Sequence, residues 1–332
     1  MTDVRQQTRG DAHKDAHKDG DKDTRKEMLD RVVNGAGFVA ALDQSGGSTP
    51  KALAQYGIAA AAYADEAEMF ALMHEMRVRI MTAPSFTGDR VIAAILFERT
   101  MQGEVAPGTA DGTPVPAFLW SRGIVPFLKV DEGLQPERDG VSLMKPLTGL
   151  ADRLAAAARL GMFGTKMRST IRLASPGGIA AVVAQQFEVA ASIARQGLMA
   201  IVEPEVLIDS PDKDAAEALL RDELLRRLDA LPDDMPAGAR VILKLTLPSD
   251  PGRYGDLLRH DRVARLLALS GGYPRGEACR RLAATPGMIA SFSRALTEGL
   301  QVSMSNPAFD AALERSIAEI HAASTTKRRA GD

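Results

Sequence analysis

The chain has 332 residues, 45% of them hydrophobic, which is enough to bury a large core as two small domains or as one α/β barrel. Its formal net charge is -2, so no global field favours nucleic acid or an anionic membrane as a partner. A single cysteine, Cys279, excludes an internal disulfide and a thiolate metal cluster, which fits a reducing compartment. No continuous apolar run approaches the ~18 residues of a membrane helix, and the N-terminus lacks the apolar region of a secretory signal. We therefore expect a soluble, cytoplasmic protein.

Residues 1–26 are almost wholly polar and repeat an Asp-Ala-His-Lys unit at residues 11–14 and 15–18. Such a segment buries too little apolar surface to fold alone, so composition favours a disordered, solvated extension. The alternative is a metal-binding arm, since His13 and His17 recur at helical spacing. We place the folded domain at residues 27–323 and a polar tail at residues 324–332.

From Glu27 onwards, short apolar runs alternate with amphipathic segments. Eight such runs are expected as strands: residues 38–43, 91–97, 123–131, 162–168, 198–205, 241–247, 263–270 and 288–294. Helix start signals, either a capping residue or a proline, lie between them at Ser48, Asp65, Ser175, Pro211 and Pro307. The helix after Asp65 carries an apolar stripe of Met69, Leu72, Met73, Met76 and Ile80.

Eight alternating strand and helix units without a break in composition predict a single (β/α)8 TIM barrel. The segment at residues 98–122, with three prolines and Trp120, is expected to be an irregular connection before the third strand. The last helix is expected at residues 307–323.

A lysine, Lys244, lies in the middle of the apolar run at residues 241–247. A buried ammonium without a partner tends to give up its proton, and a neutral lysine amine is a nucleophile. The alternative is a buried lysine that simply pairs with a carboxylate. Side chains of alternate barrel strands share a layer, so Lys166 and Lys244 can lie at one level with Glu203 between them. That arrangement suits amine chemistry with a carboxylate to carry protons, although a purely structural ion network has the same composition.

Polar residues follow every predicted strand, and in a barrel these positions face the site. Backbone N–H groups of the Ser270-Gly271-Gly272 turn after the seventh strand, with Arg294 after the eighth, are suited to a phosphate. A second glycine and serine turn runs from Asp43 to Ser48 and is followed by Lys51. Two anion sites suggest a substrate with a phosphate at each end.

Six segments in order along the chain resemble class I (Schiff-base) fructose-bisphosphate aldolase in its bacterial form. They are Leu42-Asp-Gln-Ser-Gly-Gly-Ser-Thr-Pro-Lys51, Phe163-Gly-Thr-Lys-Met-Arg168, Val202-Glu-Pro-Glu205, Leu243-Lys-Leu-Thr246, Leu269-Ser-Gly-Gly272 and Ser291-Phe-Ser-Arg294. The resemblance implies reversible cleavage of fructose 1,6-bisphosphate to dihydroxyacetone phosphate and glyceraldehyde 3-phosphate, in glycolysis and gluconeogenesis, without a cofactor or a metal.

The resemblance also implies residue roles. Lys244 would form the Schiff base, Glu203 would be the principal proton-transfer residue and Glu205 would support it. Asp43 and Lys166 would assist at the C3–C4 bond and the C4 hydroxyl. The ketone-side phosphate would bind Ser270, Gly271, Gly272 and Arg294, and the aldehyde side would face Ser45, Ser48, Lys51, Lys129 and Arg168. Two departures stand out: Ala52 replaces a basic residue of the animal members, and the C-terminal tail lacks their terminal tyrosine.

Three alternatives remain open at this point. A metal-dependent aldolase fits poorly, because none of the five histidines falls in a strand run. Another Schiff-base lyase, such as a transaldolase or an aldolase for an epimeric bisphosphate, would share the lysine. A non-catalytic sugar-phosphate sensor would bind without turnover. The partners expected are small sugar phosphates, with no nucleic acid and no membrane, and the sequence leaves a homo-oligomer open.

Overall fold

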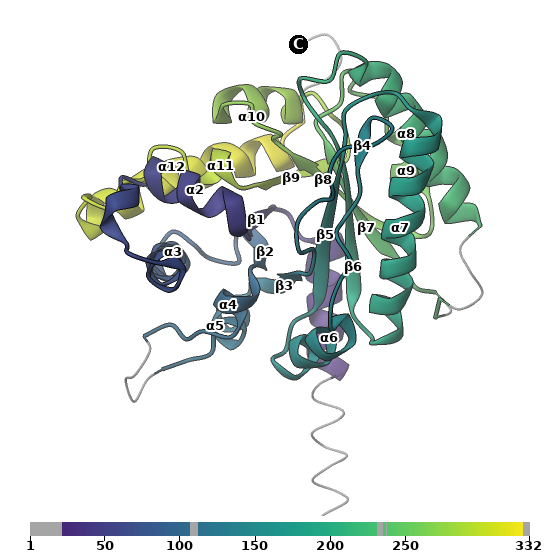
Figure 1. Ribbon diagram of the computed structural model, residues 1–332. Coiled ribbons are helices and arrows are strands. Elements are labelled where there is room, and N and C mark those ends of the chain that lie inside the picture. Colours follow the sequence, from purple (N-terminus) through teal and green to yellow (C-terminus); the bar gives the residue numbers. More distant parts are fainter. Residues whose placement is uncertain (1–21, 107–111, 231–234, 237, 328–332) are drawn as a thin grey trace, which may run out of the picture. The chain divides into compact units, whose positions relative to one another are not determined.

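The computed structural model describes residues 22–106, 112–230, 235–236 and 238–327 (Figure 1). The chain divides into two compact units, Met1–Gly35 and Ala36–Asp332, which we describe separately. In the first unit, residues 22–34 are helical, so this helix begins inside the segment predicted to be a polar extension. His13 and His17 lie outside the described residues.

The second unit is built on eight parallel strands. They are β1 (Phe38–Leu42), β2 (Val91–Leu96), β3 (Val125–Lys129), β5 (Gly164–Ile171), β6 (Met199–Val206), β7 (Val241–Thr246), β8 (Val263–Leu269) and β9 (Met288–Phe292). Each strand pairs with its neighbours along the chain, and the pairing of β1 with β9 and of β3 with β5 closes the sheet. The (β/α)8 barrel is thereby confirmed, and each strand lies within one of the eight predicted runs or extends it by a few residues. A two-residue strand, β4 (Val141–Ser142), pairs antiparallel with β5 outside the barrel repeat.

The strands form because their residues are apolar and buried on both faces, as parallel strands covered by helices require. Every residue of β1, β2, β7 and β9 is buried. Buried hydrophobic residues of strands and helices join in one core cluster. The polar residues of the strands, such as Lys166, Glu203 and Lys244, are therefore exceptions.

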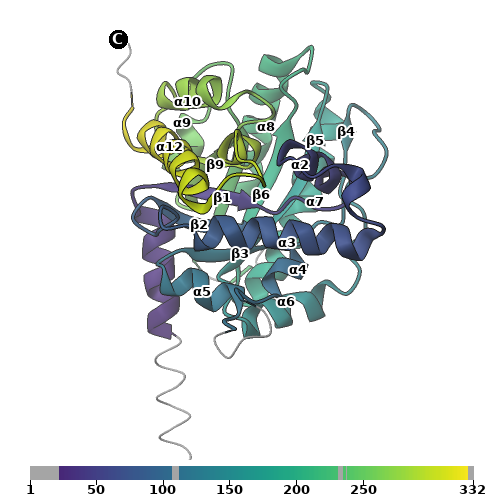
Figure 2. The ribbon, with the colours of Figure 1, turned by 90° about the vertical axis from the view of Figure 1, so that its left-hand side faces the viewer.

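The helices of this unit begin largely where the sequence signals predict. They are α2 (Thr49–Gln55), α3 (Glu66–Thr82), α4 (Glu98–Met101), α5 (Val115–Ser121), α6 (Leu150–Arg159), α7 (Pro176–Arg195), α8 (Lys213–Asp229), α9 (Gly255–Arg259), α10 (Arg275–Ala283), α11 (Arg294–Thr297) and α12 (Asn306–Thr325), with short 3₁₀ turns at Gly46–Ser48 and Ala60–Ala62. Asp65 and Ser175 cap α3 and α7 by accepting from the backbone N–H of Glu68 and Gly178. Figure 2 shows α3 next to α2 and α4, the helices that follow β1 and β2.

Two details of the helices differ from the prediction. The connection at residues 98–122 is not wholly irregular, because α4 and α5 occupy its ends and Pro116 lies in the first turn of α5, where a proline is tolerated. The last helix extends two residues past residue 323, into the segment predicted as a polar tail.

Helix α7 is long and apolar enough to pass a length-and-composition test for a membrane span, the single such helix among the described residues. It packs against β5, β6 and α8, and half of its most apolar window is buried inside the protein. These are the properties of a barrel core helix, so the test is weak evidence for a membrane span.

Candidate active site

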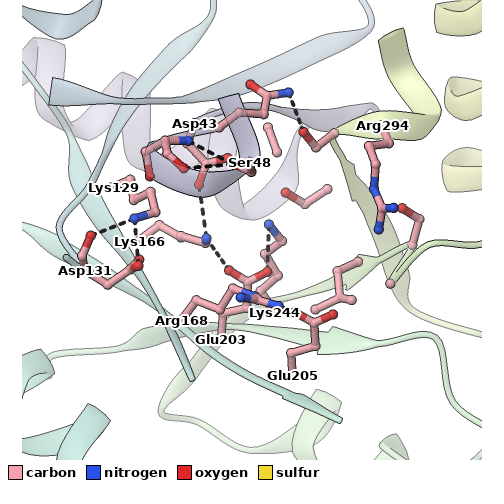
Figure 3. Close-up of a pocket in the computed structure, with 18 of the residues that line it drawn as sticks. Asp43, Ser48, Lys129, Asp131, Lys166, Arg168, Glu203, Glu205, Lys244 and Arg294 are labelled. Carbon is pink, nitrogen blue, oxygen red and sulfur yellow. Dashed lines mark hydrogen bonds and ion pairs between the residues drawn. The ribbon is translucent and has the colours of Figure 1, made fainter. Parts of the chain in front are cut away.

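A hollow of about 560 Å³ opens at the carboxyl ends of the barrel strands (Figure 3). It brings together all but one of the predicted site residues: Asp43, Ser45, Ser48, Lys51, Lys129, Lys166, Arg168, Glu203, Glu205, Lys244, Ser270, Gly271 and Arg294. The exception, Gly272, lines an adjacent hollow that shares Arg294 with the first.

Glu203 stands between two lysines, as the layer argument predicts. Its Oε1 lies 3.0 Å from Nζ of Lys244, and its Oε2 lies 2.5 Å from Nζ of Lys166. Lys166 also contacts Oδ2 of Asp43 at 3.0 Å. All four side chains are at least 90% buried. The contacts form one chain from Asp43, just after β1, through β5 and β6 to β7. Within it, a proton can pass directly between Lys244 and Glu203.

Burial and charge have opposite effects on the pKa values of Asp43 and Lys166, two neighbours in this chain. Burial favours the neutral form of Asp43, but the charges of Lys166, Lys244 and Lys129 outweigh it and hold the pKa of Asp43 well below its usual value. Burial likewise favours neutral Lys166, but Asp43, Glu203 and Asp131 outweigh it and raise the pKa of Lys166 well above its usual value. Asp43 is therefore a carboxylate, and Lys166 an ammonium, at neutral pH.

The backbone of Glu203 is fixed from outside the barrel by a glutamine that the sequence reading did not identify. The Glu203 N–H donates to Oε1 of Gln186, a fully buried residue of α7, at 2.8 Å. This contact lies where β6 and β7 separate, since their paired register ends at Val202 and Leu243. Beyond that point the hydroxyl of Thr246 donates to the carbonyl of Val206 at 2.6 Å. Glu203 and Lys244 thus lie on neighbouring strands just past the end of their paired register.

Two further ion pairs lie on the wall of the hollow. Arg168 Nε contacts Oε2 of Glu205 at 2.5 Å, and Lys129 Nζ contacts Oδ1 of Asp131 at 2.7 Å. In Figure 3 Lys129 and Arg294 lie on opposite sides of Lys244. The hollow therefore offers cations at both ends with the buried lysine between them.

The turn after β8 has a shape that glycine permits. Gly271 and Gly272 have φ values of 61° and 123°, which L side chains rarely adopt. A Cβ on Gly271 would lie 2.5 Å from Cγ2 of Ile208, and one on Gly272 would lie 3.2 Å from a terminal guanidinium nitrogen of Arg294. This close approach places the turn and the arginine side by side, as a phosphate site requires.

Several lining residues were not among the predicted site residues: Gln44, Gln55, Asp131, Gly133, Leu134, Ser291 and Ser293. Asp131 and Ser293 lie at predicted strand ends. The sequence therefore predicts that they lie near the site, but it assigns them no function there. Gln186 was not identified because a glutamine on a helix is ordinarily exposed, although it lies at helical spacing from the apolar Val182 and Val183.

A barrel with a buried lysine and carboxylate chain at the carboxyl ends of its strands belongs to the barrel enzymes that can use a lysine amine as a nucleophile. Comparison with known proteins narrows this class. Residues 25–228 match the family model of fructose-bisphosphate aldolase class-I. The chain is 51% identical over 302 residues to the class 1 fructose-bisphosphate aldolase of Synechocystis sp., covering 91% of this chain and 98% of the relative.

Among solved structures, the aldolase of Plasmodium falciparum superposes with a TM-score of 0.71 at 21% identity, covering 93% of this chain and 97% of that one. The Cgl0159 protein of Corynebacterium glutamicum superposes with a TM-score of 0.51 at 12% identity over 90% of this chain and 92% of that one. These two likenesses support the barrel fold. The chain belongs to the class I fructose-bisphosphate aldolase family, and it is a carbon–carbon lyase.

Proposed function

We propose that Lys244 is the residue that forms a Schiff base with fructose 1,6-bisphosphate in a reversible aldol cleavage. The observation that supports this role is the contact of its amine with Glu203 at the floor of the hollow. Among the lysines of the hollow, Lys166 is held between two carboxylates and Lys129 is paired with Asp131. Lys129 is also held by the backbone carbonyl of Asp131 at 2.6 Å. Lys244 contacts one oxygen of a carboxylate that it shares with Lys166, which suits a group that must give up a proton and then attack.

The steps follow from the positions of these groups. Glu203 takes the proton of Lys244, and the free amine attacks the C2 carbonyl to give a carbinolamine, which loses water when Glu203 returns a proton to the leaving oxygen. Asp43 accepts the proton of the C4 hydroxyl as the C3–C4 bond breaks, and the electron pair passes into the iminium to leave an enamine. Glyceraldehyde 3-phosphate departs. Protonation of C3 and hydrolysis of the imine then release dihydroxyacetone phosphate and restore Lys244.

The remaining residues are assigned to support these steps. Lys166 keeps Asp43 ionised and orients the C4 hydroxyl, and Glu205, tied to Arg168, supports Glu203 in proton transfer. The phosphate next to the ketone carbon is assigned to Ser270, Gly271, Gly272 and Arg294. The other phosphate is assigned to the opposite end of the hollow, at Ser45, Ser48, Lys51, Lys129 and Arg168.

The partners that this site supports are sugar phosphates, and the proposed compartment is the cytoplasm, with glycolysis and gluconeogenesis as the setting. Turnover of fructose 1,6-bisphosphate, with its two triose phosphate products identified, tests the proposal. Parallel assays with an epimeric bisphosphate distinguish it from an aldolase of different stereochemistry. Light scattering against the 35.4 kDa of a single chain measures whether copies associate.

A further inference from the structure

A buried cation outside the hollow contacts the segment that follows β1. Arg77 of α3 is 2% exposed and is the largest of the fully buried side chains. It follows Met76 within the apolar stripe of α3, where a charged residue is costly and is seldom retained without a use.

Arg77 joins segments that follow two different barrel strands. Its Nη1 donates to the hydroxyl of Thr100 in α4 at 2.8 Å, and its Nη2 donates to the backbone carbonyl of Gln44. Both acceptors are neutral, so these contacts position groups without forming an ion pair. Gln44 directly follows Asp43, and its own side chain donates to the hydroxyl of Ser293 at 2.7 Å.

Arg77 holds the peptide between Gln44 and Ser45, close to Asp43 in the chain. Asp43 lies one residue beyond the end of β1, outside the sheet ladder that fixes the strand. The next residues, Gln44 to Ser48, form the turn that lines the hollow. A shift of the Gln44 carbonyl would carry the backbone of Gln44 and Asp43 with it and move the Asp43 carboxylate away from Lys166, which it now meets at 3.0 Å.

We propose that Arg77 is a positioning residue, which holds the turn after β1 so that Asp43 faces Lys166 and the substrate. This inference rests on the role proposed above for Asp43. A guanidinium suits the task because its rigid fork reaches two oxygens on different segments at once, whereas a lysine amine offers one flexible point.

The test compares Arg77→Met with Arg79→Met. Arg79 lies two residues along the same helix and anchors a different region: it donates to the hydroxyl of Tyr56 and the carbonyl of Val302, and it stacks over the ring of Phe309. Both changes remove an arginine that fixes loops, so both are expected to lower stability. Arg77→Met alone is expected to lower kcat, by roughly 30-fold or more, with KM changed less than about threefold.

A double-mutant cycle separates positioning from general destabilisation. If Arg77 acts through Asp43, Arg77→Met added to Asp43→Asn costs little further turnover, because the carboxylate that it positions is already gone. Trapping of dihydroxyacetone phosphate on Lys244 by borohydride should remain intact in Arg77→Met. Multiplicative losses in the cycle, or equal kcat in Arg77→Met and Arg79→Met, would overturn the inference.

Two milder variants cover the case in which Arg77→Met does not fold. Arg77→Lys and Thr100→Val are each expected to lower kcat by a few-fold, roughly 3-fold to 10-fold, and each loss should vanish on the Asp43→Asn background. Unchanged kcat in both would equally overturn the inference. If instead Asp43 did not have the role proposed for it, Asp43→Asn would itself keep full turnover. That result is distinguishable from failure of the Arg77 inference alone.

Discussion

The amine nitrogen of Lys244 lies 3.0 Å from Oε1 of Glu203, while the second oxygen of the same carboxylate is taken by Lys166. A single buried carboxylate therefore contacts the side-chain nitrogens of two lysines. Lys166 is also held by Asp43, so it stabilises the carboxylate without needing to give up its proton. Lys244 is the member of the set whose proton Glu203 can take and return.

Glu203→Gln is expected to lower kcat by roughly 100-fold or more while substrate still binds, because the amide keeps the shape of the carboxylate and cannot carry a proton. Glu205→Gln should have a milder effect, since that carboxylate is occupied by Arg168. Steady-state kinetics of both variants measures the ranking. The reverse ranking would mean that the two roles are exchanged.

Arg294→Ala is expected to weaken binding of dihydroxyacetone phosphate and of the bisphosphate by about 1.5 to 3 kcal/mol, the usual contribution of a charge-assisted hydrogen bond. Arg294 is exposed at the rim of the hollow, so stability should change less than affinity. Calorimetric titration with both ligands measures the loss, and thermal unfolding serves as the control. Unchanged affinity for both ligands would remove this residue from the phosphate site.

The charge of Asp43 is expected to stay constant across the working pH range. Its folded pKa is depressed below the ordinary value of 3.8, so its ion pair contributes stability that is present above that value and is lost as pH falls through the folded pKa. Lys166, with its pKa raised, keeps its proton until the solution is strongly alkaline. Neither group should therefore change charge between about pH 5 and about pH 9.

The pH profile of kcat tests this directly. Asp43→Asn should lower the whole profile without moving its limbs, because the limbs belong to other groups. Loss of the acidic limb in that variant would show that Asp43 titrates during turnover, contrary to the strong stabilisation of its carboxylate by three lysines.

Removal of residues 1–21 is expected to leave kcat and the unfolding temperature nearly unchanged. The deleted residues are almost wholly polar and include none of the proposed site residues. Assay of the shortened chain beside the full chain measures both quantities. A tenfold fall in kcat would assign the segment a part in the site.

Much of the barrel was predictable because it depends on local patterns. Eight apolar runs between helix start signals predict the strand order, and the sharing of layers by alternate barrel strands predicts Glu203 between Lys166 and Lys244. What the sequence could not give were contacts made through partners distant in the chain. Gln186 meets the backbone of Glu203 only because α7 packs against β6. Its place in the apolar stripe of α7, unlike that of Gln185, indicates burial but does not identify this partner.

Arg77 could be predicted only in part from the sequence. A charged residue next to Met76 in an apolar helix stripe is a visible anomaly in the sequence, but its partners, Gln44 and Thr100, follow other strands. Gly272 was assigned to the phosphate site from a sequence motif. In the structure it lies beside Arg294 but lines the neighbouring hollow and not the main one.

The most direct test of the mechanism is chemical trapping of the imine. Dihydroxyacetone phosphate with borohydride is expected to leave one reduced ligand on the peptide that contains Lys244 and none on other lysines, since exposed amines with an ordinary pKa of about 10.4 are almost entirely protonated at neutral pH. Lys244→Met should abolish trapping and turnover while the fold persists, and exhaustive chelation should leave the wild-type activity intact. Labelling of Lys166 would contradict the assignment of the nucleophile, and absence of trapping together with loss of turnover in chelator would contradict the Schiff-base mechanism itself.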